Sequence, residues 1–300
     1  MTERPDQSPI TSLRSERVRK VAALAGRSAR RKQQSFRVEG PQSIRSLLSQ
    51  RADLARELFV TARADAAHPE LADLARGAGV PVHAVEDQII RAMVREHDVE
   101  DPSSAGPVSS NLGGALVNPQ GALALGRLPA EESSAATAAI GALPTQGPVT
   151  VVVLHEVRDP GNVGTLIRTA DAAGADLVVL TRTCADPYAP KAVRAGVGSL
   201  FHLPVVTGAE IDEVLETLGS ADIATAATSG YAQDELFTAE LPPRLAWIFG
   251  NEAHGLDEHT LQAASFGVRI PLAGRAESLN VHTAATVCLF ETLRRRQARE

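Results

Sequence analysis

The spacing of apolar residues divides the chain into two α/β regions. Before residue 128, short apolar runs alternate with amphipathic segments. The pattern predicts strands at 36–40, 58–61, 80–85, 115–117 and 121–125, and helices at 15–34, 43–50, 69–78 and 86–95. Ser43 is the expected N-cap of the second helix, and residues 1–12 are expected to be disordered. Residues 1–127 are therefore predicted to form a small α/β domain.

The apolar runs become longer and richer in β-branched residues from residue 148 onward. Residues 149–154 form a near-continuous apolar run, which is typical of a strand covered on both faces. Further strands are predicted at 177–180, 223–227, 245–249 and 266–270, and helices at 163–173, 190–197, 210–218, 257–264 and 281–296. This alternation predicts a mostly parallel sheet in residues 148–300. Residues 128–147 are rich in Ala, Gly and Pro and are predicted to be a linker with at most one short helix.

The composition narrows the class of protein. Hydrophobic residues make up 44% of the chain, which is enough for ordinary cores, but aromatic residues make up only 3%, which disfavours a platform of stacked bases. Two cysteines are too few for a disulfide framework or a thiolate metal site, and the eight histidines show no ligand spacing, so no metal is expected. The polar start of the chain does not resemble a signal peptide. The uncharged run 102–126 is rich in Ser, Gly and Pro, so no membrane span is expected and we predict a cytoplasmic protein.

The net charge of −6 conceals a basic block near the start of the chain. Residues 14–37 carry nine basic side chains and one acidic side chain, a net charge of +8, which leaves −14 for the remainder. A basic block on an acidic protein is suited to the phosphates of RNA, although a solvated basic helix would look the same. The candidate RNA-binding residues are Arg27, Arg30, Arg31, Lys32 and Arg37.

Three polar motifs follow predicted strands of the second region. They are Asn162 to Arg168, Gly250 to Glu252, and Ser278 to Asn280, the last preceded by Ile270. Ligand sites of open α/β sheets gather at the carboxyl ends of strands, so the three motifs are expected to form one composite site. No G-x-G-x-x-G fingerprint is present.

Each motif also has a purely structural interpretation. Asn162 is expected to cap a helix whose arginine, Arg168, lies off the buried stripe and is either a ligand contact or a solvated side chain. Gly250 allows close approach of a ligand but is also a common turn residue. Ser278 is a good N-cap for the last helix, and backbone groups of Ile270 and Leu279 could hold an adenine edge.

These motifs, in this order, resemble the SpoU (TrmH-like) branch of the SPOUT RNA methyltransferases. The segment Lys191 to Phe201 is similar to that family's middle motif. The basic helix and the small α/β region resemble the RNA-binding domain of ribosomal-protein-L30-like fold that often precedes the methyltransferase domain.

The resemblance implies a carboxyl-terminal domain with a parallel sheet and a deep trefoil knot. It also implies a homodimer whose active site lies at the subunit interface. S-adenosylmethionine would be bound in the knot by backbone groups at Gly250, Ile270 and Leu279, with Asn280 beside them. The implied reaction is methyl transfer to a ribose 2′-hydroxyl of RNA, without a metal.

In that reaction Arg168 would stabilise the developing alkoxide, because a guanidinium pairs well with negative oxygen. Asn162, Glu252, Ser278 and Asn280 would orient the hydroxyl, the arginine and the cofactor. Ribosomal RNA, 23S in particular, is the expected substrate, and transfer RNA is the main alternative. A non-catalytic RNA-binding protein and an antibiotic-resistance methyltransferase are the other hypotheses that the sequence leaves open.

Overall fold

The computed structural model describes residue 10 and residues 12–95, 120–130 and 134–298. The chain forms two compact units, one of residues 1–129 with 188–194 and one of residues 130–187 with 195–300. Most of the predicted tail 1–12 and all of the predicted strand 115–117 lie outside the described residues.

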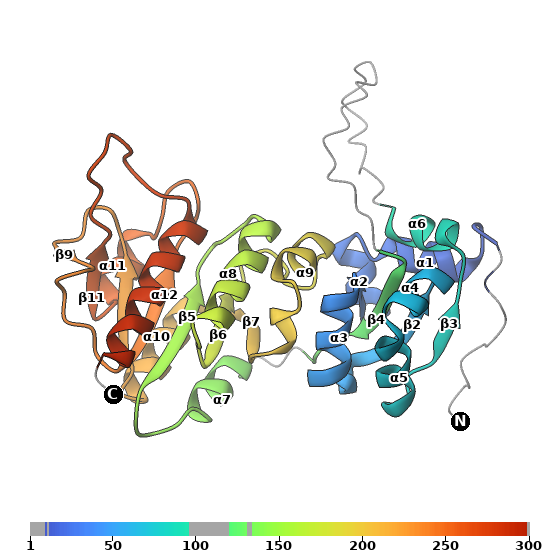
Figure 1. Cartoon of the computed structure of the whole chain (residues 1–300). Coiled ribbons are helices and arrows are strands. Elements are labelled where there is room, and N and C mark those ends of the chain that lie inside the picture. The colour runs from blue at the N-terminus through green and yellow to red at the C-terminus, as the bar shows by residue number, and fades with distance from the viewer. Residues whose placement is uncertain (1–9, 11, 96–119, 131–133, 299–300) are drawn as a thin grey trace, which may run out of the picture. The chain divides into compact units, whose positions relative to one another are not determined.

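The first unit is built on a mixed sheet of four strands (Figure 1). Its strands lie in the order β1 (Ser35–Glu39), β4 (Ala122–Arg127), β2 (Ala55–Val60) and β3 (Val82–Ala84). Strand β4 is antiparallel to both neighbours, and β3 is parallel to β2. Helices α1 (Glu16–Ala23) and α6 (Asp87–Val94) pack on Phe59, Leu123 and Leu125 of the sheet. The other elements are α2 (Arg27–Gln33), α3 (Pro41–Gln50), η1 (Ala52–Leu54), α4 (Ala62–Ala67) and α5 (Pro69–Gly77). The alternation of helices and strands predicted for this region is observed, whereas its bounds as a separate domain, 1–127, stay a prediction.

The prediction of a single basic helix at 15–34 is wrong, because the helical conformation is interrupted between α1 and α2. Leu24 turns into the core, where it is buried, and Gly26 is the N-cap of α2. The guanidinium of Arg30 donates to the carbonyl oxygens of Leu24 (2.9 Å) and Ala25 (2.8 Å). The side chain thus satisfies carbonyls freed where α1 ends.

The second unit is built on a sheet of seven strands in which every neighbouring pair is parallel. The strands lie in the order β7 (Val205–Ala209), β6 (Leu177–Thr181), β5 (Val149–Leu154), β10 (Arg244–Phe249), β8 (Ala224–Thr228), β11 (Phe266–Arg269) and β9 (Asp234–Glu235). The parallel sheet predicted from the apolar pattern is therefore confirmed.

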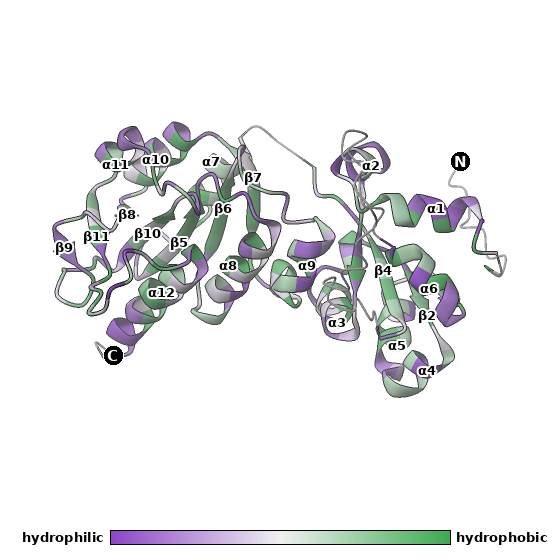
Figure 2. Ribbon diagram, turned by 90° about the horizontal axis from the view of Figure 1, so that it is seen from above, coloured by the Kyte–Doolittle hydropathy of each residue, from purple (hydrophilic) through white to green (hydrophobic). Residues whose placement is uncertain are grey.

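Helices cover both faces of this sheet, as Figure 2 shows from above. On one side lie α7 (Ala135–Gly141), α10 (Ile211–Ser220) and α11 (Glu258–Ala263), and on the other lie α8 (Pro160–Ala172) and α12 (Val281–Gln297). Of the remaining elements, η2 (Ser199–Phe201) belongs to this unit, and most of α9 (Pro190–Gly196) belongs to the first unit. The α7 side holds a continuous apolar core, and on the α12 side the indole of Trp247 donates to Thr292 Oγ1 (3.0 Å).

The segment predicted to be a linker contributes to the core of the second unit. Its helix α7 buries Ala136 and Ile140 among residues of β5, β6 and α10. The predicted short helix is thus present, but part of the 128–147 segment belongs to a folded unit. Low charge and many alanines are typical of a packed helix as well as of a linker. Composition alone therefore gave the wrong prediction for this part of the segment.

Strand β11 lies between two strands that the chain joins by only five residues. We call residues 229–233 the strap. Thr228 of β8 and Asp234 of β9, which flank the strap, both pair with Val268 of β11. The strap therefore crosses β11, and a Cβ on Gly267 would lie 3.3 Å from the Cβ of Ala232.

The end of α12 fastens the chain that follows the strap. Arg295 donates to the carbonyl oxygens of Leu236 (2.6 Å) and Ala239. Hydrogen bonds from the guanidinium groups of Arg294 and Arg295 outweigh the effect of burial and lower the pKa of Glu291 to about 2. Glu291 therefore stays ionised and holds Arg295 in place near neutral pH.

Five short elements were not predicted from the sequence, namely α4, β7, β9 and the 3-10 helices η1 and η2. Strand β7 is an edge strand in which Gly208 has φ +79°, and β9 has only two residues, so neither carries a clear period. Helix α3 begins at Pro41 after Gly40, which means that Ser43 is a buried residue inside the helix and not its N-cap. Within the described parts of the chain, no helix has the length and apolarity needed to cross a membrane.

Candidate functional site

A tight loop follows β10 at the carboxyl edge of the second sheet. Asn251 and Gly255 exchange both backbone hydrogen bonds at 2.9 Å, and Asn251 Oδ1 accepts from Ala253 N at 2.8 Å. A Cβ on Gly250 would lie 2.5 Å from the carbonyl carbon and oxygen of Gly255 and 2.6 Å from Leu256 N. Position 250 therefore requires glycine because the backbone of its own loop lies too close for a side chain.

Glu252 joins this loop to the start of α8. Its carboxylate accepts from the backbone N–H groups of Arg158 (3.2 Å) and Asp159 (3.1 Å) and from Asn162 Nδ2 (3.0 Å). Partial burial alone would raise the pKa of Glu252, but the hydrogen bonds from Asn162 and the backbone outweigh it, and the pKa lies below its usual value. A carboxylate of this kind is a poor proton acceptor and a good anchor.

The cap of α8 is Asp159 and not Asn162 as predicted. Asp159 Oδ1 accepts from Asn162 N (2.9 Å), and Pro160 is the first residue of the helix. Aspartate followed by proline is a recognised start signal for a helix, so the sequence did carry this information. The side chain of Asn162 is left free to bind Glu252, which brings the first and second motifs together.

Arg168 points away from the packed side of α8. Val163, Leu166 and Ile167 of the helix are buried, whereas Arg168 is exposed. Its guanidinium forms no hydrogen bond or ion pair with any residue that the structure describes. All of its donors are therefore available to a ligand or to a second chain.

Helix α8 packs against α12, which begins at the third motif (Figure 1). Thr169, next to Arg168, is buried, and its hydroxyl lies 2.9 Å from His282 Nε2. Asn280 is the N-cap of α12 and accepts from His282 N at 2.9 Å, which corrects the prediction that Ser278 caps this helix. The first and third motifs thus lie on two helices in direct contact.

The segment between β11 and α12 offers unused backbone groups. Residues 272–278 are exposed, while Ile270 and Leu279 at its ends are half-buried. Within the described chain, residues 272–279 form no hydrogen bond, and Ser278 is among them. Among the described residues, Ile270, Ser278 and Leu279 therefore form no hydrogen bond with Arg168 or Glu252, and their predicted roles remain predictions.

Two of the five predicted RNA contacts are buried. The side chain of Arg37 is 0% exposed, donates to the carbonyl oxygens of Met93 (3.0 Å) and Val94 (3.1 Å), and lies 2.9 Å from Glu39 Oε1. Arg30 is 3% exposed and fastens the end of α1. We correct the prediction for both, because a buried guanidinium with internal acceptors does not reach a phosphate. Arg27, Arg31 and Lys32 are exposed, as the prediction requires.

Other features of the described residues do not indicate a second catalytic site. No group of three or more His, Cys, Asp or Glu side chains among them is placed to hold a metal ion. A surface hollow of about 620 Å³ is lined by residues 233–235 and 238–240 with Phe266 and Arg269. It includes none of the predicted cofactor residues, and its three acidic side chains would repel phosphate.

The chain is similar to known RNA methyltransferases along most of its length. The model of the SpoU rRNA Methylase family matches residues 149–290, and that of the MRM3-like substrate binding domain matches residues 15–98. The 23S rRNA (guanosine-2'-O-)-methyltransferase RlmB of Pseudomonas putida is 35% identical over 52% of this chain. The alignment covers 62% of that relative, so the chain spans about three fifths of its length.

Two further similarities extend to both units. The 23S rRNA (uridine(2479)-2'-O)-methyltransferase of Streptomyces viridochromogenes is 30% identical over 69% of this chain and 71% of its own length. The AdoMet-bound rRNA methyltransferase of Sinorhizobium meliloti superposes with a TM-score of 0.76 at 27% identity, covering 96% of this chain and 98% of that one. With the family model and these relatives in agreement, the chain belongs to the SpoU rRNA methylase family.

Proposed function

We propose that this protein is an S-adenosylmethionine-dependent methyltransferase that modifies a ribose 2′-hydroxyl of ribosomal RNA. The observation that carries the proposal is the guanidinium of Arg168, which is exposed and has no partner among the residues that the structure describes. Its helix is fixed at the start by Glu252 and packs against the helix that Asn280 begins. The named relatives support 23S rRNA as the substrate, since both are 23S rRNA 2′-O-methyltransferases.

The chemistry requires a cation close to the attacking oxygen. A ribose hydroxyl is a weak nucleophile that loses its proton during the attack, and the neighbouring phosphate would repel a carboxylate base. Arg168 stabilises the developing alkoxide and can hold the adjacent phosphate through its planar fork of donors. Because arginine remains protonated, the proton passes to the phosphate or to water and not to Arg168.

The residues at the carboxyl edge fit S-adenosylmethionine, which supplies an electrophilic methyl group on its sulfonium. Gly250, Ile270 and Leu279 would hold it through backbone groups, with Asn280 at its side. The fit is supported by the unused donors and acceptors of residues 272–279. Backbone N–H and C=O groups can bind the adenine edge and the carboxylate of S-adenosylmethionine without the help of charged side chains.

Asn162 and Glu252 act on the reaction as positioning residues. Together they hold the first turn of α8 through the hydrogen bonds to Arg158 N and Asp159 N. Since Arg168 lies on this helix, the pair orients the guanidinium. Ser278, exposed and unbonded within the described chain, is left to orient the ribose hydroxyl.

We propose the fold of the family for both units. A deep trefoil knot in the second unit is supported by the strap, because β11 lies between two strands that only residues 229–233 connect. An L30-like fold of the first unit is supported by the match to the MRM3-like substrate binding domain.

A homodimer is supported by an apolar stripe on α12. Phe290 is 43% exposed, and the half-buried Val287 lies three residues before it on the same side of the helix. We expect the wild type to sediment as a dimer. Phe290→Asp is expected to raise the dimer dissociation constant at least about tenfold, because it removes an apolar ring that the interface would bury. Phe237→Asp, which changes an exposed phenylalanine outside α12, is the control. A monomeric wild type would contradict the dimer.

RNA binding is assigned to the exposed part of the basic block. Replacing Arg27, Arg31 and Lys32 together with glutamine is expected to weaken binding and to reduce the slope of log K against log salt by up to about 3, since each lost phosphate contact contributes about 0.9. Filter binding of an unmodified 23S rRNA transcript from 50 mM salt upward measures this. The matched control replaces Arg51, Arg63 and Arg76, which are exposed in the same unit beside Asp53, Asp87 and Asp73. An equal change of slope in both variants would refute the assignment.

The natural substrate is found by mapping 2′-O-methyl groups in ribosomal and transfer RNA from cells with and without the gene. One ribosomal position that loses its methyl group agrees with the proposal, and a transfer RNA position identifies the alternative substrate. An unchanged map indicates a non-catalytic binding protein. The proposed site of action is the cytoplasm, where ribosomal RNA is assembled in bacteria such as those of the named relatives.

A further inference from the structure

We infer that Tyr231 stacks on a nucleobase of the RNA substrate next to the ribose that is methylated. This inference rests on the proposed function and adds a residue that recognises the substrate. Tyr231 is 99% exposed, the most exposed of the large hydrophobic residues in the described chain. It also forms no ring contact with another described residue.

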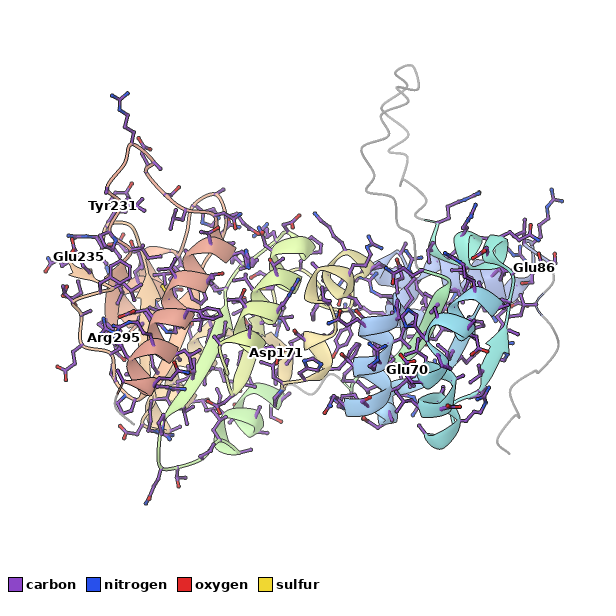
Figure 3. The ribbon with its side chains drawn as sticks, viewed as in Figure 1. Glu70, Glu86, Asp171, Tyr231, Glu235 and Arg295 are labelled. Carbon is purple, nitrogen blue, oxygen red and sulfur yellow. The ribbon has the colours of Figure 1, made fainter. Side chains whose placement is uncertain are left out.

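Tyr231 lies at the edge of the sheet that carries the candidate site. It belongs to the strap, which leaves the carboxyl end of β8. Strands β8 and β10 are parallel and in register, with Ala227 opposite Ile248, and Thr228 Oγ1 donates to Ile248 O at 2.9 Å. The strap and the loop at Gly250 therefore leave neighbouring strands in the same direction. Figure 3 shows Tyr231 at this end of the second unit and Arg295 toward the other end of α12.

The backbone around Tyr231 is held on both sides while its side chain is free. Ser229 N donates to Val268 O (3.0 Å), and Tyr231 N and Ala232 N donate to Ser229 Oγ (3.3 Å) and Ser229 O (3.2 Å). On the other side, Arg269 donates to Ala232 O at 2.7 Å. A ring on an ordered backbone loses only two side-chain torsions on binding, which makes it an efficient contact residue.

The surroundings of the ring favour a base over a phosphate or a protein. Gly230, Gln233 and Asp234 are exposed beside it, so the ring is not part of a broad apolar patch that another protein would cover. Asp234 disfavours a phosphate at this position, whereas the uncharged face of a base has no such penalty. Stacking needs only one ring, and the scarcity of aromatic residues in the chain does not count against it.

The test uses the full-length protein and three variants, Tyr231→Ala, Tyr231→Leu and Tyr231→Phe. We expect Ala to weaken binding of an unmodified 23S rRNA transcript and to raise its KM by about 5- to 100-fold, the range of base–aromatic stacking. Leu keeps the bulk without the π face and is expected to recover only part of the loss, while Phe restores binding. The slope against salt is expected to stay constant across the series, since no phosphate contact changes.

Three results would overturn the inference. The first is binding of RNA by the Tyr231→Ala variant within about twofold of the wild type. The second is an equal loss of RNA affinity in the Tyr231→Phe and Tyr231→Ala variants. The third is a loss of RNA affinity that is explained by weaker S-adenosylmethionine binding or by dissociation of the dimer. Calorimetry and sedimentation of each variant measure these two effects. If the wild type itself transfers no methyl group, the proposed function fails; if the wild type is active and Tyr231→Ala is normal, only this inference fails.

Discussion

Arg168→Ala is expected to lower kcat for methyl transfer by about 100- to 1,000-fold, to near the background rate. The variant removes the cation that we propose to face the developing alkoxide, an interaction that would be strong only in the transition state. Arg168 has no partner among the described residues and alanine favours helices, so the thermal midpoint should hardly change. Single-turnover transfer from radiolabelled S-adenosylmethionine to an unmodified 23S rRNA transcript measures the rate.

The controls separate chemistry from binding. Arg168→Ala should bind S-adenosylmethionine nearly as the wild type does, because the proposed cofactor contacts are backbone groups of other loops. Arg168→Lys keeps the charge but not the planar fork, so an intermediate rate is expected. If Arg168→Ala retained most of the wild-type rate, the assigned role would be wrong.

Gly250→Ala is expected to disrupt both the fold of the candidate site and the binding of S-adenosylmethionine. Its Cβ would lie 2.5 Å from backbone atoms of Gly255, and backbone cannot rotate away as a side chain can. The loop must shift, which displaces Glu252 from the start of α8. Overpacking of this kind costs about 1–3 kcal/mol, equivalent to a thermal midpoint lower by about 3 to 10 °C in a unit of this size.

Differential scanning calorimetry and titration with S-adenosylmethionine measure the two effects. The matched control is Gly141→Ala, at the end of α7, where an added Cβ meets nothing within 4 Å. That variant should keep the wild-type affinity and have a midpoint no lower than that of the wild type, because alanine favours the helix more than glycine does. A Gly250→Ala protein with unchanged midpoint and affinity would show that the loop is not tightly closed around position 250.

The parts of the fold that follow from local pattern were predictable from the sequence. The run 149–154 consists of β-branched residues up to Leu154, and it forms β5 with the predicted bounds. Helix α8, directly after β5, was also expected, because its apolar stripe has the helical period. The last helix was expected at 281–296 and is present as α12. Helix starts were placed less well: Asp159 and Asn280, not Asn162 and Ser278, are the caps. Several polar residues compete at these sites, and only the folded chain decides between them.

The sequence did not reveal which charged side chains become buried in the folded chain. Counting charges placed Arg30 and Arg37 in an RNA-binding block, although both satisfy internal carbonyl oxygens. One signal was available for Arg37, since Glu39 lies two residues on and therefore on the same face of the strand. The hydrogen bond from Asn162 to Glu252 spans 90 residues and could not be read from either motif alone. The motifs predicted that a site exists, and the structure supplied the contacts that connect its first two parts.

We propose that this chain transfers a methyl group to a ribose oxygen with the help of Arg168. The most direct measurement incubates purified wild type and Arg168→Ala with isotopically labelled S-adenosylmethionine and unmodified 23S rRNA, digests the RNA, and identifies labelled nucleosides by mass spectrometry. We predict a single 2′-O-methylated nucleoside with the wild type and close to none with the variant. Label on a base, or equal label from both proteins, would contradict the account.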